Sequence, residues 1–206
     1  MKRALTIGEL LITMAIIGII ATLVLPGFLK DYHKKLYVAQ LKKVVESVEN
    51  AVNQACIDNN VSYFDQTIYS KASDGSNQQA FIDKYFKKVT VGNNQKPFSA
   101  KYTSLNGSSG AASLVAEHGY AKLASGEAVS MYCSGAVNFC VFRVDLNSTE
   151  GPNIGGRDMF MIGINKKTNK IYESRTGTDL EAMCKGNPLG EGCFGVLLEN
   201  NWEMTY

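Results

Sequence analysis

The 206-residue sequence has little histidine and lacks the close cysteine spacings that bind zinc. His33 and His118 are its only histidines, and no Cys-x-x-Cys pair occurs among its five cysteines. Zinc sites and reactions that use histidine as a base are therefore disfavoured. The sequence also lacks a nucleophile elbow and a glycine-rich phosphate loop. It gives no support for an enzyme, and we predict none.

The chain also lacks a large excess of positive or negative charge. The chain has 21 Lys and Arg against 19 Asp and Glu, a formal net charge of +2. This balance is too small to indicate a partner such as nucleic acid, and none is predicted. The mean hydropathy of −0.09 conceals a strong segregation, because the apolar residues gather at the amino-terminal end.

Residues 5–25 read LTIGELLITMAIIGIIATLVL, a run that Glu9 alone interrupts with a charge. As a helix they span roughly 31 Å, enough to cross the hydrocarbon core of a bilayer. Their Leu, Ile and Val residues favour insertion by roughly 4–7 kcal/mol, more than the roughly 2.5–3.5 kcal/mol that a central carboxylate costs. Lys2 and Arg3 favour a cytoplasmic amino terminus.

Three simpler interpretations compete with a specialised membrane helix. A secretory signal has a shorter apolar run and a small-residue cleavage site, which residues 25–29 (LPGFL) do not provide. A plain membrane anchor leaves Glu9 unexplained. A buried core helix is rarely so uniformly apolar beside basic residues.

Residues 5–12 (LTIGELLI) and 15–21 (AIIGIIA) resemble the class III signal of type IV pilins and pseudopilins. The resemblance implies cleavage between Ala4 and Leu5, methylation of the new amino terminus, and Glu9 as the fifth mature residue. In the same register Gly18 and Pro26 occupy positions where the family commonly has Gly and Pro. The chain departs from the family at the cut, where Gly followed by Phe or Met is usual.

The resemblance implies a pilin-like α+β fold, a long amino-terminal helix packed on a small antiparallel sheet. It divides the chain into a leader (1–4), an apolar helix half for membrane or filament core (5–28), an amphipathic half (29–58) and a head with a variable loop (59–206). It also assigns assembly roles to Thr6, Glu9, Gly18 and Pro26.

The chemistry of Glu9 supports an assembly role independently. A carboxylate in an apolar environment needs a partner, because an unpaired one costs several kcal/mol. Cleavage after Ala4 would create a suitable cation, the amino group of Leu5. In the family this pairing is pictured between neighbouring subunits, where it would set the register of packed helices.

Beyond Pro26 the helical pattern becomes amphipathic. One stripe consists of Leu41, Val45, Val48, Val52 and Ala55, and Asn59-Asn60 is the expected stop. Lys34-Lys35 and Lys42-Lys43 form a basic stretch that we interpret as a solvated helix face or a contact with lipid headgroups.

The head is predicted to follow with mixed elements. We expect a short helix within residues 78–89, a hairpin over 120–132 that turns at Ser125-Gly126, and strands over 137–146, 158–164 and 170–173. Residues 194–199 fit a strand or a short helix, and 202–206 a final strand.

An exported chain can form disulfides, and five cysteines allow many pairings. We favour Cys133 with Cys140 and Cys184 with Cys193, the second of which would clamp the carboxyl-terminal loop as pilins often do. Cys56 would then be a small buried apolar residue.

Residues 145–158 (DLNSTEGPNIGGRD) form the most distinctive head segment and resemble a stretch of some pilin-like proteins. Asp145, Asn147 and Asp158 supply oxygens that suit Ca²⁺. The segment fails as an EF-hand, however, because Glu150 and Gly156 stand where Gly and Glu are required. The alternative is a turn-rich loop that joins two strands and needs no cofactor.

The resemblance therefore implies a structural subunit of a type IV pilus-like filament. The precursor would lie in the bacterial inner membrane and the product in an extracellular or periplasmic filament. Its implied partners are a prepilin peptidase, a platform protein, an assembly ATPase and other pilins. Two alternatives remain: a pseudopilin of a type II secretion or DNA-uptake system, and a membrane-anchored adhesin head that does not polymerise.

Overall fold

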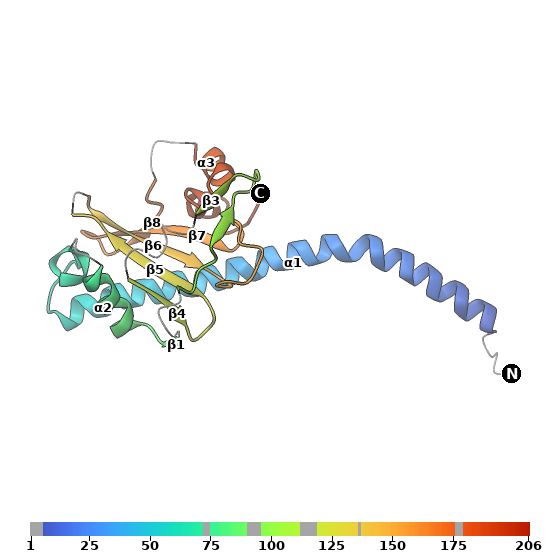
Figure 1. Ribbon diagram of the computed structural model, residues 1–206, viewed down its shortest axis with the longest axis horizontal. Helices are drawn as coiled ribbons and strands as arrows, with labels where there is room; N and C mark the ends of the chain where they lie inside the picture. Colours follow the sequence, from blue (N-terminus) through green and yellow to red (C-terminus); the bar gives the residue numbers. More distant parts are fainter. Residues whose placement is uncertain (1–5, 72–74, 90–95, 112–118, 136, 176–178) are drawn as a thin grey trace. The chain divides into compact units, whose positions relative to one another are not determined.

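The computed structural model describes residues 6–71, 75–89, 96–111, 119–135, 137–175 and 179–206. The chain forms two compact units, Met1–Leu36 and Tyr37–Tyr206. Helix α1 (Ile7–Asp58) begins in the first unit and ends in the second (Figure 1). The predicted cleavage site between Ala4 and Leu5 lies outside the described residues, and so does His118.

In the second unit, α1 presents the predicted apolar stripe to the sheet. Leu41, Val48, Val52 and Ala55 are fully buried, and they belong to one core cluster with strand residues such as Phe142 and Ile162. The helix ends at Asp58, directly before Asn59-Asn60. Asn60 adopts a φ of 53°, and the Asn59 side chain donates to the carbonyl of Ala55. Both features stop the helix where the sequence predicts.

The main sheet has six antiparallel strands in the order β1-β4-β5-β6-β7-β8 (Figure 1). Their bounds are β1 Lys88–Val89, β4 Gly119–Leu123, β5 Ala128–Cys133, β6 Phe139–Asp145, β7 Met159–Asn165 and β8 Ile171–Tyr172. The predicted hairpin is the β4–β5 pair, and Gly126 supplies the φ of 112° in its turn. The fold is therefore an α+β arrangement, as predicted.

A smaller two-stranded ribbon, β2 (Lys101–Thr103) with β3 (Ser109–Ala111), covers a second core cluster. This cluster contains Phe98, Tyr102, Ala128, Met159 and Leu189. Thr103 joins the ribbon to the loop before β7, because its amide donates to the carbonyl of Asn153 at 3.0 Å and its carbonyl accepts from Gly155 at 2.8 Å.

Short helices complete the head. They are the 3₁₀ turns η1 (Phe64–Gln66) and η2 (Ile68–Ser70) and the helices α2 (Ser76–Tyr85), α3 (Leu180–Gly186) and α4 (Cys193–Glu199). Of the two interpretations open for residues 194–199, the structure adopts the helix.

The final strand predicted over 202–206 is wrong. Asn201 and Trp202 have φ values of 51° and 65°, which are incompatible with an extended strand. The Trp202 amide instead closes the end of α4 by donating to Leu197, and its ring packs on Phe194 at 5.6 Å between centroids. The end of the chain is therefore a turn after α4 and not a strand.

Candidate functional site

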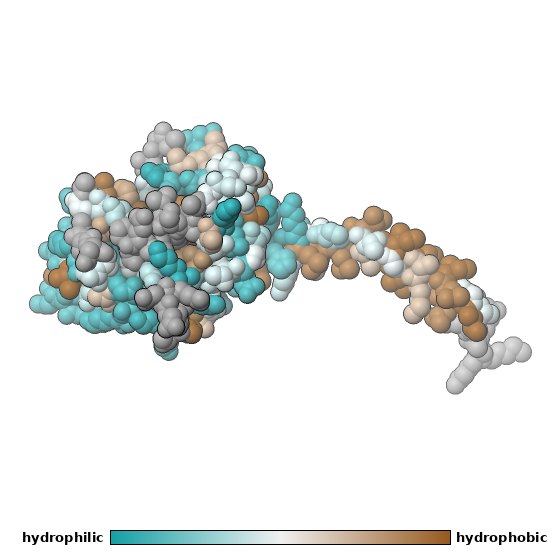
Figure 2. Space-filling view, viewed as in Figure 1, coloured by the Kyte–Doolittle hydropathy of each residue, from teal (hydrophilic) through white to brown (hydrophobic). Residues whose placement is uncertain are grey.

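The first unit exposes an apolar helix surface. Every residue from Thr6 to Ile20 is exposed, and apolar side chains continue to Leu29 (Figure 2). The helix is long and apolar enough to cross a membrane. Soluble surfaces rarely carry an apolar area of this extent, because water disfavours it. This surface is therefore a candidate site for burial in lipid or against other helices.

Glu9 lies in the first turn of this helix, and its carboxylate closes a capping box with Thr6. Oε2 of Glu9 accepts hydrogen bonds from the Thr6 amide and hydroxyl, both at 2.9 Å, and the Glu9 amide donates to Thr6 Oγ1 at 3.2 Å. The reciprocal bonds satisfy amides that a helix terminus otherwise leaves unpaired. Thr6 and Glu9, two of the predicted assembly residues, thus act as one local group.

The two threonines within the apolar part of this helix bond to its own backbone. The hydroxyls of Thr13 and Thr22 each donate to the carbonyl three residues earlier at 2.8 Å. Gly18 has open space where a Cβ would lie, and Pro26 stands inside the helix without an amide to donate. Glu9 is therefore the one described residue between Thr6 and Leu29 that brings a formal charge to the apolar surface.

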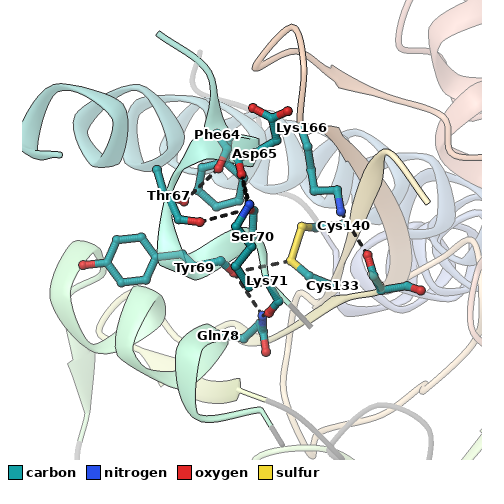
Figure 3. The surroundings of a disulfide bond; sticks show 11 residues. Phe64, Asp65, Thr67, Tyr69, Ser70, Lys71, Gln78, Cys133, Cys140 and Lys166 are labelled. Carbon is teal, nitrogen blue, oxygen red and sulfur yellow. Dashed lines mark hydrogen bonds between the residues drawn. A yellow bond between two sulfur atoms is a disulfide. The ribbon is translucent and has the colours of Figure 1, made fainter. Parts of the chain in front are cut away.

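The structure joins Cys133 to Cys140, the first of the two pairings favoured from the sequence. The two cysteines are direct partners across β5 and β6, and both are buried. Figure 3 shows this bond beside η2, where Sγ of Cys133 lies 3.6 Å from the carbonyl oxygen of Tyr69. Lys166 donates to the carbonyl of Ser134 in the same hairpin at 2.9 Å. The bond joins the adjacent ends of β5 and β6, next to the segment that follows α1.

The second favoured pairing joins Cys184 in α3 to Cys193 in α4. Both cysteines are fully buried, and the loop between them packs against Gly155 in the segment before β7. A Cβ on Gly156 would lie 2.7 Å from Sγ of Cys193, and one on Gly190 would overlap the backbone of Met159. This clamp therefore needs glycine at both close approaches. Cys56 is free and buried, as expected.

Asp145, at the end of β6, is fully buried and accepts a hydrogen bond from the Tyr102 hydroxyl of the β2–β3 ribbon. Burial raises the pKa of Asp145 to about 7; the Tyr102 hydrogen bond opposes this shift, and the nearby charge of Asp158 adds to it. The carboxylate therefore links the ribbon to the main sheet across 43 residues of sequence.

Asp158 is fully buried as well, and its carboxylate organises its own loop. Its two oxygens accept from the amides of Asn153 and Ile154, both at 2.7 Å. Burial raises its pKa, although these amide bonds oppose the shift. Such bonds from a side chain to the nearby backbone are typical of a turn-rich loop.

The three predicted calcium residues thus lie in one loop region, but protein donors already contact both of its carboxylates. Asn147 donates from its side chain to the carbonyl of Gly151 at 2.6 Å. Within the described residues, no group of three or more His, Cys, Asp or Glu side chains is placed to hold a metal. Calcium binding stays a prediction. Measuring the melting temperature of the head at increasing Ca²⁺ concentration tests this prediction. An unchanged melting temperature would contradict calcium binding.

The stability of the head is expected to fall between about pH 4 and pH 7 because of Asp145. An acid whose pKa is raised in the folded state binds its proton more tightly there than in the unfolded chain. Its stabilising effect is complete below the unfolded pKa near 4 and is lost as the pH rises through the folded value near 7. The slope should approach about 1.4 kcal/mol per pH unit.

Denaturant unfolding of the full chain in detergent, followed by the fluorescence of Trp202, measures this slope. The variant Asp145→Asn should reduce this slope to the part that Asp158 contributes, whereas Glu150→Gln, at an exposed position of the same loop, should leave it unchanged. An equal slope in Asp145→Asn and the parent would assign the pH dependence to other groups.

Sequence reasoning missed Tyr102 as a member of this cluster. The residue lies in a polar stretch with no periodic pattern, and its partner lies 43 positions away. Sequence reasoning also missed the contact of Ser148, whose hydroxyl donates to the distant carbonyl of Pro97 at 2.6 Å. No local sequence signal indicates either contact.

No protein-family model matches the chain, and neither does any curated protein or solved structure.

Proposed function

We propose that this chain is a structural subunit of a type IV pilus-like filament. The precursor inserts in the bacterial inner membrane through the first part of α1, loses residues 1–4 and assembles through packing of its amino-terminal helix. The resemblance of residues 5–21 to a class III signal motivates the proposal. The proposal includes a pilin-like fold for the head. It also includes three partners: a prepilin peptidase, a platform protein and an assembly ATPase.

The observation that carries the proposal is the exposed apolar helix with one carboxylate in its first turn. A plain membrane anchor needs the apolar length but gains nothing from Glu9, which costs free energy in lipid. A helix that leaves lipid to pack against identical helices can use the charge, because a carboxylate paired across subunits specifies register. The capping box with Thr6 keeps Glu9 at a fixed place on the helix until such a partner is present.

The head is consistent with export. Two disulfides are typical of proteins that mature in an oxidising compartment. With Lys2 and Arg3 on the cytoplasmic side, the second unit would lie on the opposite side of the membrane. An export route and an exposed apolar helix together support assembly outside the cytoplasm.

Intact-mass measurement of the chain recovered from a bacterial host with a prepilin peptidase tests the proposal. We expect a mature chain that begins at Leu5 and carries one added methyl group. A cut after Gly8 would produce a distinct mass and would place Glu9 at the terminus. Retention of Met1–Ala4 would falsify the proposed processing, and a peptidase-deficient host provides the control.

A further inference from the structure

A second chemical feature of the first unit lies directly after its apolar surface. Residues 30–35 include Lys30, Tyr32, Lys34 and Lys35, which we call the basic collar. Lys30 and Lys35 are exposed, and 54% of the Tyr32 surface is accessible. At 100° per residue, Lys30 and Lys34 lie about 40° apart on one side of the helix, and Lys35 lies about 140° from Lys30. The collar therefore presents positive charge over about 140° of the helix circumference.

The position of the collar matches the depth of a membrane surface. Residues 7–29 rise about 34 Å in an α-helix, slightly more than the roughly 30 Å of a hydrocarbon core. Lys30 is thus the first charged residue on the head side of the span. Tyrosine is enriched at the level of the headgroups, and lysine extends its ammonium group toward them.

The charge of the collar is unusual for this side of a membrane. Basic residues near a membrane span favour the cytoplasmic side. The collar has three lysines, whereas the leader at the other end of the span has two basic residues, Lys2 and Arg3. The two disulfides nevertheless assign the head to an oxidising compartment. A collar on that side needs a compensating negative surface, and Asp31 supplies a single negative charge.

We propose that the basic collar binds the headgroups of anionic phospholipids on the head side of the membrane and thereby fixes the depth of α1. The inference rests on the proposed membrane insertion of the precursor. Each lysine near an anionic surface gains attraction that salt screens within about 10 Å. The lysines of the second unit are less suited to this role, since Lys42, for example, lies over the ring of Trp202 at 5.1 Å.

Spin-labelled lipids test the proposal on the full precursor in vesicles of phosphatidylcholine and phosphatidylglycerol. The spectrum reports the fraction of each labelled lipid that contact with the protein restricts. We expect a preference of roughly two- to fivefold for phosphatidylglycerol at low salt, and a weaker one at high salt. Lys30→Gln with Lys35→Gln should at least halve the preference, whereas Asp31→Asn should increase it.

A matched control separates the collar from overall charge. Lys167→Gln with Lys170→Gln removes the same charge from exposed positions between β7 and β8 and should preserve the preference. An equal loss in both double variants would overturn the proposal, and so would normal restriction of both lipids without any preference. If neither lipid is restricted, the chain has not inserted and the proposed membrane role itself is wrong.

Discussion

Replacing Glu9 by alanine is expected to leave the precursor in the membrane and to reduce filament assembly by at least about tenfold. Removal of a carboxylate makes insertion of the helix easier, by up to roughly 2.5–3.5 kcal/mol at the bilayer centre and by less near a helix end. A loss of filaments would therefore not follow from failed insertion. It would follow from loss of the charge that we propose to pair with the Leu5 amino group of a neighbouring subunit.

Membrane fractionation and a count of sheared filaments measure the two parts of this prediction. Glu9→Gln keeps the shape of the side chain and can still accept from Thr6, so it separates the charge from the capping box. Thr13→Ala is the matched polar control, since its hydroxyl bonds within its own helix. Normal filaments from Glu9→Ala would show that the proposed pairing does not control assembly.

Removing the carboxyl-terminal disulfide, with Cys184→Ala and Cys193→Ala, is expected to destabilise the head by roughly 2–3 kcal/mol. Most of this cost comes from the conformational entropy that the unfolded chain gains when the bond is absent. The cost is modest because the bond closes a short loop. A local effect adds to it, because Gly156 lies against both sulfur atoms. The segment before β7, with the backbone bonds of Asp158, should therefore open more often.

Chemical unfolding gives the global change, and amide exchange of residues 153–159 gives the local one. The matched control replaces Cys133 and Cys140 by alanine, which removes a disulfide of similar loop length between two paired strands. That variant should lose stability without faster exchange at residues 153–159. Unchanged exchange in the Cys184/Cys193 variant would mean that the clamp does not hold this loop.

The helix and the central hairpin were predictable because their signals are local. Leu41, Val48 and Val52 recur at the period of a helix, and each is fully buried. Ser125-Gly126 provides turn chemistry between two alternating segments, and β4 and β5 pair across it. In both cases neighbouring residues carry the whole pattern, so no distant contact is needed to read it.

The buried cluster around Asp145 in the head was only partly predictable from the sequence. The sequence drew attention to Asp145, Asn147 and Asp158 but gave no reason to connect Asp145 with Tyr102. The ribbon that carries Tyr102 consists of two three-residue strands, too short for a periodic pattern. Its placement depends on bonds to the loop before β7, which join residues about 50 positions apart.

The sequence by itself determined the apolar first part of α1, the position of Glu9 in its first turn and the point where the helix ends, because each depends on spacing along the chain. Tertiary structure alone decided that Trp202 packs on Phe194 instead of joining a strand, and that Asp145 meets a tyrosine inside the core. Those outcomes depend on which surfaces meet after the chain has folded, and packing contacts of that kind leave no periodic trace in the sequence. The near-zero mean hydropathy conceals this division, since it averages an exposed apolar helix with a head that buries its own core.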